Sequence, residues 1–285
     1  MTRLVKMFRW ALPLIFGIGA LAFAGLQPAL GQESLPPPAG PQGALAADNT
    51  LNICANAAAL PYTSEESATP GFQLELHHAI AVALDRRESV TWVHNRRAAN
   101  RLQCGGWMSR IVAPNMLPTE GQYLTEPYMG TGFVIVRKAG ASTRFESLAA
   151  LLAEPEFRAG GRVGIFLGAW IGGIVERNGV ATSGYVEQQD IIEAVQRGDI
   201  AAGIVRREDV GWYLRQNPGS LAVIEMYKFD PDFHWDVAMG LRQSNPELLA
   251  QINGVLERFR ADGTLQAITE KYGFPYLPPY LSQSH

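Results

Sequence analysis

The chain has 285 residues, of which 47% are hydrophobic and 18% charged, and its formal net charge at pH 7 is −3. This length is enough for a sizeable core in one large domain or two small ones. The near-neutral balance gives no basic surface for nucleic acid or for an anionic membrane, so neither is an expected partner.

The N-terminal 31 residues have the pattern of a secretory signal peptide. Residues 1–9 carry three basic side chains, residues 10–26 carry no charge, and small residues suited to cleavage end at Gly31. An uncleaved membrane anchor is the alternative, but an apolar stretch of 17 residues that contains Pro13 is short for a span. Cleavage near Gly31 predicts a periplasmic protein with 21 basic and 27 acidic residues and no integral membrane segment.

Residues 32–48 are rich in Pro and Gly and predict an extended tether, after which residues 49–137 predict a first α/β lobe. Strand and helix patterns alternate there, and in such sheets ligands lie outside the carboxyl ends of the strands. The loop Leu60-Pro61-Tyr62 follows the first strand at this face. The expected strands are 51–55, 90–93, 107–112 and 132–136, and the expected helices begin at Gly71 and span 95–102.

Residues 138–231 repeat the alternation and predict a second α/β lobe. Two connections between the lobes, near Arg137 and near Asp232, would form a hinge. The sequence therefore predicts two hinge-linked α/β lobes with a central cleft. The expected strands are 162–165, 185–186, 200–205 and 221–226, and the expected helices are 148–152, 170–178, 190–196 and 209–214.

Residues 232–285 return the chain to the first lobe. Apolar and polar residues alternate over 233–242, which predicts a half-buried strand. Residues 244–247 have the form of a capping box and predict the start of a helix. A second short helix follows and ends at Gly273, a residue type that commonly terminates helices.

The two cysteines of the chain, Cys54 and Cys104, lie in the exported part. In an oxidising compartment we expect them to form a disulfide bond. A reactive thiol or a metal pair is the alternative, but the sequence offers neither a CxxC motif nor a histidine spacing that would add ligands.

Several motifs resemble those of type II periplasmic solute-binding proteins, the extracellular family best known from amino-acid ABC transporters. The motifs that carry this likeness over residues 51–276 are Leu60-Pro61-Tyr62, Gly71-Phe72, Thr125-Glu126-Pro127-Tyr128 and Gly198-Asp199-Ile200. A subgroup encoded beside quinoprotein (PQQ) dehydrogenases, which includes methanol oxidation system protein J, is similar in further features. These are the two cysteines and the motifs ICANAAALPYT (53–63), WDVAMGLR (235–242) and KYGFPYLPP (271–279). The resemblance implies the type II periplasmic binding fold and a quinoprotein dehydrogenase or its cytochrome as partner.

The chain departs from the family where amino-acid binders grip their ligand. The arginine that holds the ligand's α-carboxylate in the family falls on Gly121 here. Where an acid should meet the α-amino group, Arg206 and Arg207 come first and Asp209 only later. The helix start Gly168-Ala169-Trp170 lacks the family's hydroxyl. We therefore do not expect an ordinary amino-acid site.

The side chains left near the expected cleft are aromatic and basic. They suit a planar, anionic or amphipathic ligand, or a protruding element of a protein partner. Core packing is the alternative for Phe72 and Trp107, and a solvated turn is the alternative for Arg206 and Arg207. No metal site, cofactor motif or catalytic pair is visible. The candidate binding residues are Tyr62, Phe72, Trp107, Tyr128, Trp170, Arg206 and Arg207.

Three functions remain open. The favoured hypothesis is a non-enzymatic, monomeric periplasmic protein that assists a PQQ-dependent methanol or alcohol dehydrogenase during maturation. The second is an ABC-transporter receptor for a small polar or amphipathic ligand. The third is an enzyme on the same fold, such as a cyclohexadienyl dehydratase, for which Glu75, Glu120 and Asp209 are the acid or base candidates.

Overall fold

The structure is a computed structural model that describes residues 49–94, 98, 102, 104–112, 123–145, 147–242 and 246–280. The expected signal peptide and tether, residues 1–48, lie outside these ranges. All described residues belong to one compact unit, 39–285. No helix within the described ranges is both long and apolar enough to cross a bilayer.

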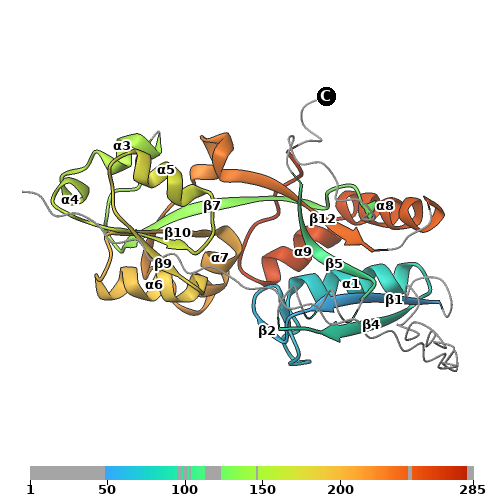
Figure 1. Ribbon diagram of the computed structural model, residues 1–285. Coiled ribbons are helices and arrows are strands. Elements are labelled where there is room, and N and C mark those ends of the chain that lie inside the picture. The colour runs from blue at the N-terminus through green and yellow to red at the C-terminus, as the bar shows by residue number, and fades with distance from the viewer. Residues whose placement is uncertain are drawn as a thin grey trace, which may run out of the picture. The chain divides into compact units, whose positions relative to one another are not determined.

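The strands form one large mixed sheet and two small ones (Figure 1). In the large sheet the order is β5-β12-β7-β10-β8-β9, with β11 also paired to β7 and β6 to β12. A parallel pair, β1 with β4, and a short antiparallel pair, β2 with β3, stand apart from it. The strands are β1 (Thr50–Ala55), β2 (Ala58–Ala59), β3 (Thr63–Ser64), β4 (Arg87–Trp92), β5 (Gly106–Val112), β6 (Tyr123–Leu124), β7 (Met129–Lys138), β8 (Val163–Phe166), β9 (Thr182–Tyr185), β10 (Ala202–Arg206), β11 (Leu221–Ile224) and β12 (His234–Leu241).

Helices cover these sheets, and most of them lie where apolar periodicity predicts them. The helix expected at 95–102 and the capping box at 244–247 fall largely outside the described residues. The α-helices are α1 (Phe72–Ala83), α3 (Leu148–Leu152), α4 (Pro155–Arg158), α5 (Ile171–Arg177), α6 (Gln188–Arg197), α7 (Arg207–Gln216), α8 (Pro246–Ala261) and α9 (Thr264–Lys271), and the 3-10 helices are η1 (Met226–Lys228) and η2 (Pro231–Phe233).

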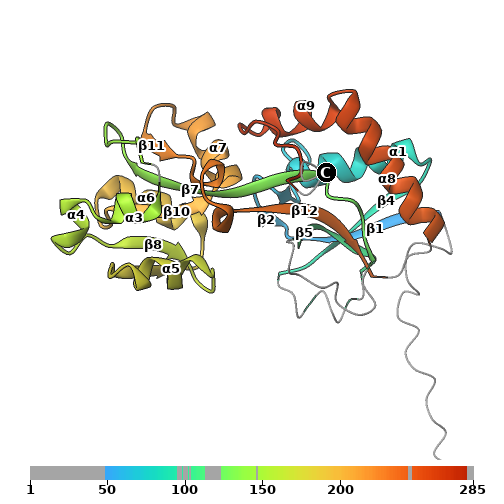
Figure 2. The same cartoon turned by 90° about the horizontal axis from the view of Figure 1, so that it is seen from above.

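Strand β7 joins two groups of elements. Its first residues, up to Gly132, pair with β12, and from Phe133 onward it pairs with β10 and β11. We call β1, β4, β5, β12, α1, α8 and α9 the first group, and β8–β11 with α3–α7 the second group. Figure 2 shows β7 running from one group into the other. The change of partner lies five residues before Arg137, where the sequence predicts the first connection.

The Arg137 guanidinium forms ion pairs within the second group, with Glu154 (2.8 Å) and Glu156 (2.7 Å). The 3-10 helix η2, which contains Asp232, lies directly before β12. The domain limits given by the sequence pattern, and the hinge between them, stay a prediction.

Strand β12 corrects one expectation. Alternation predicts a half-buried strand, but every residue after His234 is buried. The polar positions are covered by the end of the chain: the backbone N–H of Tyr280 donates to Asp236 Oδ1 (2.7 Å), and the Tyr280 ring stacks on His234 at 3.9 Å. A polar residue with a hydrogen-bond partner is buried at little cost, so alternation alone does not locate solvent.

The C-terminal segment Gly273 to Tyr280, here called the C-terminal strap, also contacts the second group. Arg207 of α7 donates to the carbonyl of Pro275, and its guanidinium lies over the Phe274 ring. Gly211 of α7 packs directly against the backbone of Gly273. The strap therefore connects α7 of the second group with the segment that follows α9 of the first group.

Cys54 and Cys104 form the expected disulfide bond, with their Cα atoms 5.5 Å apart. Both residues are buried beside Val93, and Trp107 packs against this small cluster. The bond joins β1 to the residues that lead into β5, within the first group.

Alanine substitutions at two helical glycines test the packing of the strap, because they should change the free energy of unfolding in opposite directions. A Cβ at Gly211 would lie 2.6 Å from the carbonyl oxygen of Gly273, whereas a Cβ at Gly254 in α8 would meet nothing within 4 Å. We expect Gly211→Ala to lower the free energy of unfolding by about 1 kcal/mol or more. Gly254→Ala should raise it by about 0.5–1 kcal/mol because alanine favours the helix. Urea unfolding of both variants measures this, and equal effects would contradict the packing.

Candidate functional site

Two cavities meet at Tyr62 and Arg206. The outer cavity has a volume of about 740 Å³ and the inner cavity about 100 Å³, and both side chains line both spaces. The outer cavity is lined by Asn56, Ala58, Ala59, Leu60, Tyr62, Phe166, Val186, Glu187, Gln188, Gln189, Asp190, Ile192, Arg206, Asp209 and Trp212. The inner cavity is lined by Tyr62, Phe72, Gln73, Ser109, Ile111, Met129, Thr131, Arg206, Glu208, Trp235 and Val237.

The start of α1 fixes the loop that carries Tyr62. The backbone N–H groups of Phe72 and Gln73 donate to the carbonyls of Pro61 (2.9 Å) and Tyr62 (3.0 Å). This close approach requires Gly71, whose φ is +95° and where a Cβ would lie 2.4 Å from the Tyr62 carbonyl oxygen. The Tyr62 ring packs against Phe72, with centroids 5.5 Å apart. The tyrosine is thus held toward the second group.

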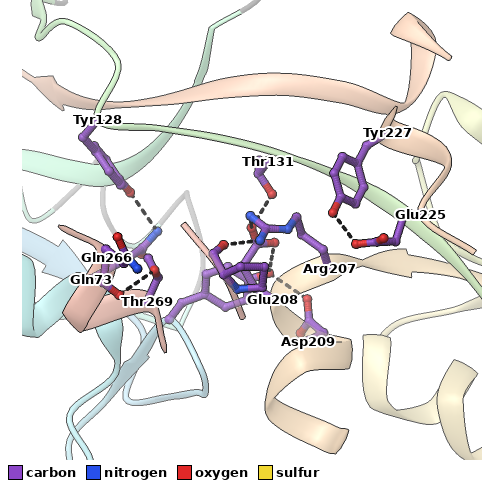
Figure 3. A network of polar contacts seen from close by, with 12 residues as sticks. Gln73, Tyr128, Thr131, Arg207, Glu208, Asp209, Glu225, Tyr227, Gln266 and Thr269 are labelled. Atoms are coloured by element: carbon purple, nitrogen blue, oxygen red, sulfur yellow. Dashed lines mark hydrogen bonds and ion pairs between the residues drawn. The ribbon is translucent and has the colours of Figure 1, made fainter. Parts of the chain in front are cut away.

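The first turn of α7 supplies the partners of Tyr62. The Tyr62 hydroxyl donates to Asp209 Oδ2 at 2.7 Å and lies 3.5 Å from Glu208 Oε2. The hydroxyl of Thr131 on β7 donates to the other carboxylate oxygen of Glu208. Figure 3 shows Thr131, Glu208 and Asp209 converging in this network. We call Tyr62, Thr131, Glu208 and Asp209 the α7 bridge, because it connects α7 to the loop before α1 and to β7.

Arg206, at the end of β10, completes the site. Its guanidinium lies over the Tyr62 ring, 5.6 Å from the centroid, which is a favourable cation–π arrangement. Its charge also acts on the buried carboxyl of Asp209. Burial raises the pKa of Asp209 to about 7, although Arg206 and the Tyr62 hydroxyl act in the opposite direction. Burial and the nearby Asp209 raise the pKa of Tyr62 well above its usual value.

Three of the candidate residues named from sequence line the cavities: Tyr62, Phe72 and Arg206. Trp170, the N-terminal flank of α5, is 48% exposed and lies near them through Trp235, with ring centroids 5.4 Å apart. Its indole N–H donates to the carbonyl of Asp232 (3.2 Å). The assignment of these side chains to binding stays a prediction.

The other three candidates have packing roles. Trp107 packs beside the disulfide bond, and Tyr128 is buried with its hydroxyl donating to the carbonyl of Met108 (2.6 Å). Arg207 points to the C-terminal strap, with its guanidinium over the Tyr227 and Phe274 rings. Figure 3 shows it beside Glu208, but it lines neither cavity.

Sequence reasoning missed Glu208, Thr131 and Gln73, which are all buried and line the inner cavity. One signal was available for Glu208, since acidic residues directly after a strand commonly occupy the first turn of a helix. Gly121, which replaces the family's arginine, lies outside the described residues, as does Glu120.

Among the described residues, no group of three or more His, Cys, Asp or Glu side chains is placed to hold a metal ion. Glu75 accepts hydrogen bonds from Tyr272 (2.6 Å) and Lys271 (2.5 Å), which ties α1 to α9. Asp209, the other acid candidate that is described, accepts a hydrogen bond from the Tyr62 hydroxyl.

Comparison with known proteins gives a family and a fold. A family model described as bacterial extracellular solute-binding proteins, family 3, matches residues 51–275. A search of curated protein sequences found no significant match.

Among solved structures, similar ones include MxaJ from Methlophaga aminisulfidivorans MPT, with a TM-score of 0.63, 16% identity, and coverage of 80% of this chain and 100% of that one. The periplasmic binding protein XoxJ from Methylobacterium extorquens AM1 is similar with a TM-score of 0.62 and 17% identity, and the match covers 80% of this chain and 99% of that one. The GluR0 ligand-binding core in complex with L-glutamate is similar with a TM-score of 0.60 and 18% identity, and the match covers 80% of this chain and 99% of that one. These similarities show the mixed α/β fold of type II periplasmic binding proteins, as predicted.

The pKa of Asp209 predicts a pH dependence of stability. The folded protein holds this proton up to about pH 7, whereas an unfolded aspartate releases it near pH 4. The folded state therefore binds more protons in this interval, so this group makes stability fall as pH rises from about 4 to 7. We expect Asp209→Asn to lose that part of the slope, measured by urea unfolding across this range. Asp190→Asn, on the exposed start of α6, is the control and should keep the slope. Equal slopes in all three proteins would contradict the assignment.

Proposed function

Since the chain belongs to the bacterial extracellular solute-binding proteins of family 3, we propose that it is a non-enzymatic periplasmic binding protein that assists a PQQ-dependent alcohol dehydrogenase. Its role would be to bind the dehydrogenase, or its cytochrome partner, during maturation. The observation that carries this proposal is the α7 bridge, in which the protein's own side chains satisfy one another between the two groups.

An amino-acid receptor needs polar groups that are free to take the ligand's charged ends. A carboxylate is held best by a guanidinium fork, and an ammonium group by an unengaged acid. Here Asp209 accepts from Tyr62, and Glu208 accepts from Thr131 on one oxygen. Arg206 stands where the family's acid is expected and lies over an aromatic ring. This arrangement favours a role other than gripping an amino-acid head group.

The identity of the proposed partner is inferred from the resemblance of sequence motifs. The cysteines and the segments 53–63, 235–242 and 271–279 are similar to those of the quinoprotein-associated subgroup. MxaJ and XoxJ are among the structural neighbours, but so are proteins bound to glutamate, glutamine or arginine. All lie below 25% identity, so the link to methanol oxidation rests on the motifs.

The outer cavity supports a second candidate, an ABC-transporter receptor for a small polar or amphipathic solute. A volume of about 740 Å³ is in the usual range for small-molecule sites. Tyr62, Phe166 and Trp212 give it aromatic walls, which suit a ligand with a flat apolar part.

Complex formation tests the favoured function. We expect the mature protein to co-elute in gel filtration with the PQQ-free form of a quinoprotein dehydrogenase from the same organism. Loading the dehydrogenase with PQQ should weaken the complex if the role is maturation. Failure to bind either form, or the cytochrome partner, would contradict the proposal.

Thermal unfolding tests the choice between the candidates. A ligand that binds only the folded state raises the melting temperature in proportion to its concentration relative to Kd. We expect none of the twenty common amino acids to raise it, because the α7 bridge engages the acids that an ammonium group would need and Arg206 lies over the Tyr62 ring. A clear rise with one amino acid would favour the receptor function instead.

A further inference from the structure

Exposed apolar side chains gather on one part of the second group. Among the described residues, seven large hydrophobic side chains are exposed, and three of them come from the loops that follow β8 and β9. They are Leu167, Trp170 and Val186, with exposed fractions of 56%, 48% and 64%. We call these three the apolar rim.

A hydrogen bond and side-chain packing join two of the segments that carry the apolar rim. The backbone N–H of Leu167 donates to the carbonyl of Tyr185 (2.8 Å), and the Leu167 side chain lies against Gly184. The β8–β9 pairing sets this neighbourhood, since Phe166 is paired with Tyr185 directly before Leu167 and Val186. Leu167 and Val186 therefore follow adjacent strand ends, and Trp170 comes three residues after Leu167.

Trp170 gives the rim a fixed anchor. Its ring packs against Phe133 at 5.3 Å and Trp235 at 5.4 Å, both buried. Its indole N–H bonds to the carbonyl of Asp232, so the ring has one defined orientation while nearly half of it stays exposed. Preorganised aromatic side chains of this kind commonly carry much of the energy of protein–protein interfaces.

Acidic side chains predominate in the segments around the rim, although Arg206 also lines the outer cavity that Val186 lines. Segment 182–190 contains Glu187 and Asp190, segment 229–233 contains Asp230 and Asp232, and segment 167–173 has no charged residue. The Trp170 indole N–H donates to the backbone carbonyl of Asp232, and Val186 directly precedes Glu187, so the backbone at both acids adjoins the rim. No Lys or Arg occurs in any of the three segments. An acidic border repels an anionic membrane and attracts a basic protein segment.

The rim also adjoins the outer cavity, because Val186, Glu187 and Asp190 line that cavity. A partner seated on the rim therefore has room for a protruding side chain. Phe166 and Trp212 offer apolar contact inside.

We propose that the apolar rim is the docking surface for the protein partner, which presents a protruding segment with an apolar tip flanked by Lys or Arg. This rests on the proposed function, since the partner is the quinoprotein dehydrogenase or its cytochrome. The tip contacts Trp170 and Val186 and enters the outer cavity, while the basic flanks face Glu187, Asp190 and Asp232.

A matched pair of double variants tests the surface. Leu167→Gln with Val186→Thr removes apolar area from the rim and leaves its charge unchanged. Leu102→Gln with Val82→Thr makes the same changes elsewhere, at side chains that are 47% and 65% exposed. We expect the rim variant to raise Kd for the dehydrogenase by roughly tenfold or more, and the control to match the wild type. Wild-type affinity should also fall as salt is added, because the acidic border is screened. Melting temperatures verify that both variants are folded.

The outcomes separate the two claims. If the wild type forms no complex with the dehydrogenase or the cytochrome, the proposed function fails. If the wild type binds and the rim variant binds equally well, the docking surface is wrong while the function stands. A dimer of the protein alone that the rim variant abolishes, or binding to anionic vesicles that it abolishes, would also overturn the proposed occupant.

Discussion

The hydrogen bond from Tyr62 to Asp209 is the contact on which the site depends, because it joins a loop to the first turn of α7, 147 residues later in the chain. It forms only if Gly71 lets α1 approach the Tyr62 loop and if α7 begins directly at the end of β10. Glu208 is then carried into contact with Thr131 on β7. One helical turn thus meets both the first group and the strand that links the groups.

The C-terminal strap contacts Arg207, the first residue of the same helical turn. Arg207 was expected to face a ligand, yet its side chain is buried and reaches Pro275 and Phe274. Neighbouring residues of α7 therefore point to different partners: Glu208 and Asp209 to the bridge, and Arg207 to the strap. In this member of a solute-binding family, the polar side chains in the first turn of α7 bind other parts of the protein. The outer cavity with its aromatic walls lies beside them.

Much of the fold could be predicted from local patterns, since strands such as 162–165 and helices such as 190–196 follow from apolar periodicity and glycine positions. The pairing of Cys54 with Cys104 followed from their number and compartment. What periodicity could not give was the partner of a buried polar group. Asp236 reads as solvent-facing but bonds to Tyr280, and Arg207 reads as a cleft cation but covers the strap. Such contacts join residues distant in sequence, so one chain without its fold does not reveal them.

We propose that the α7 bridge holds the two groups together without a ligand, which leaves the exposed rim and outer cavity for recognition. Electron paramagnetic resonance distances between spin labels at Val82→Cys on α1 and Arg177→Cys on α5 test this proposal. We expect one narrow distance distribution in the ligand-free protein, unchanged by added amino acids. A broad or two-peaked distribution that narrows when an amino acid such as glutamate is added would contradict it.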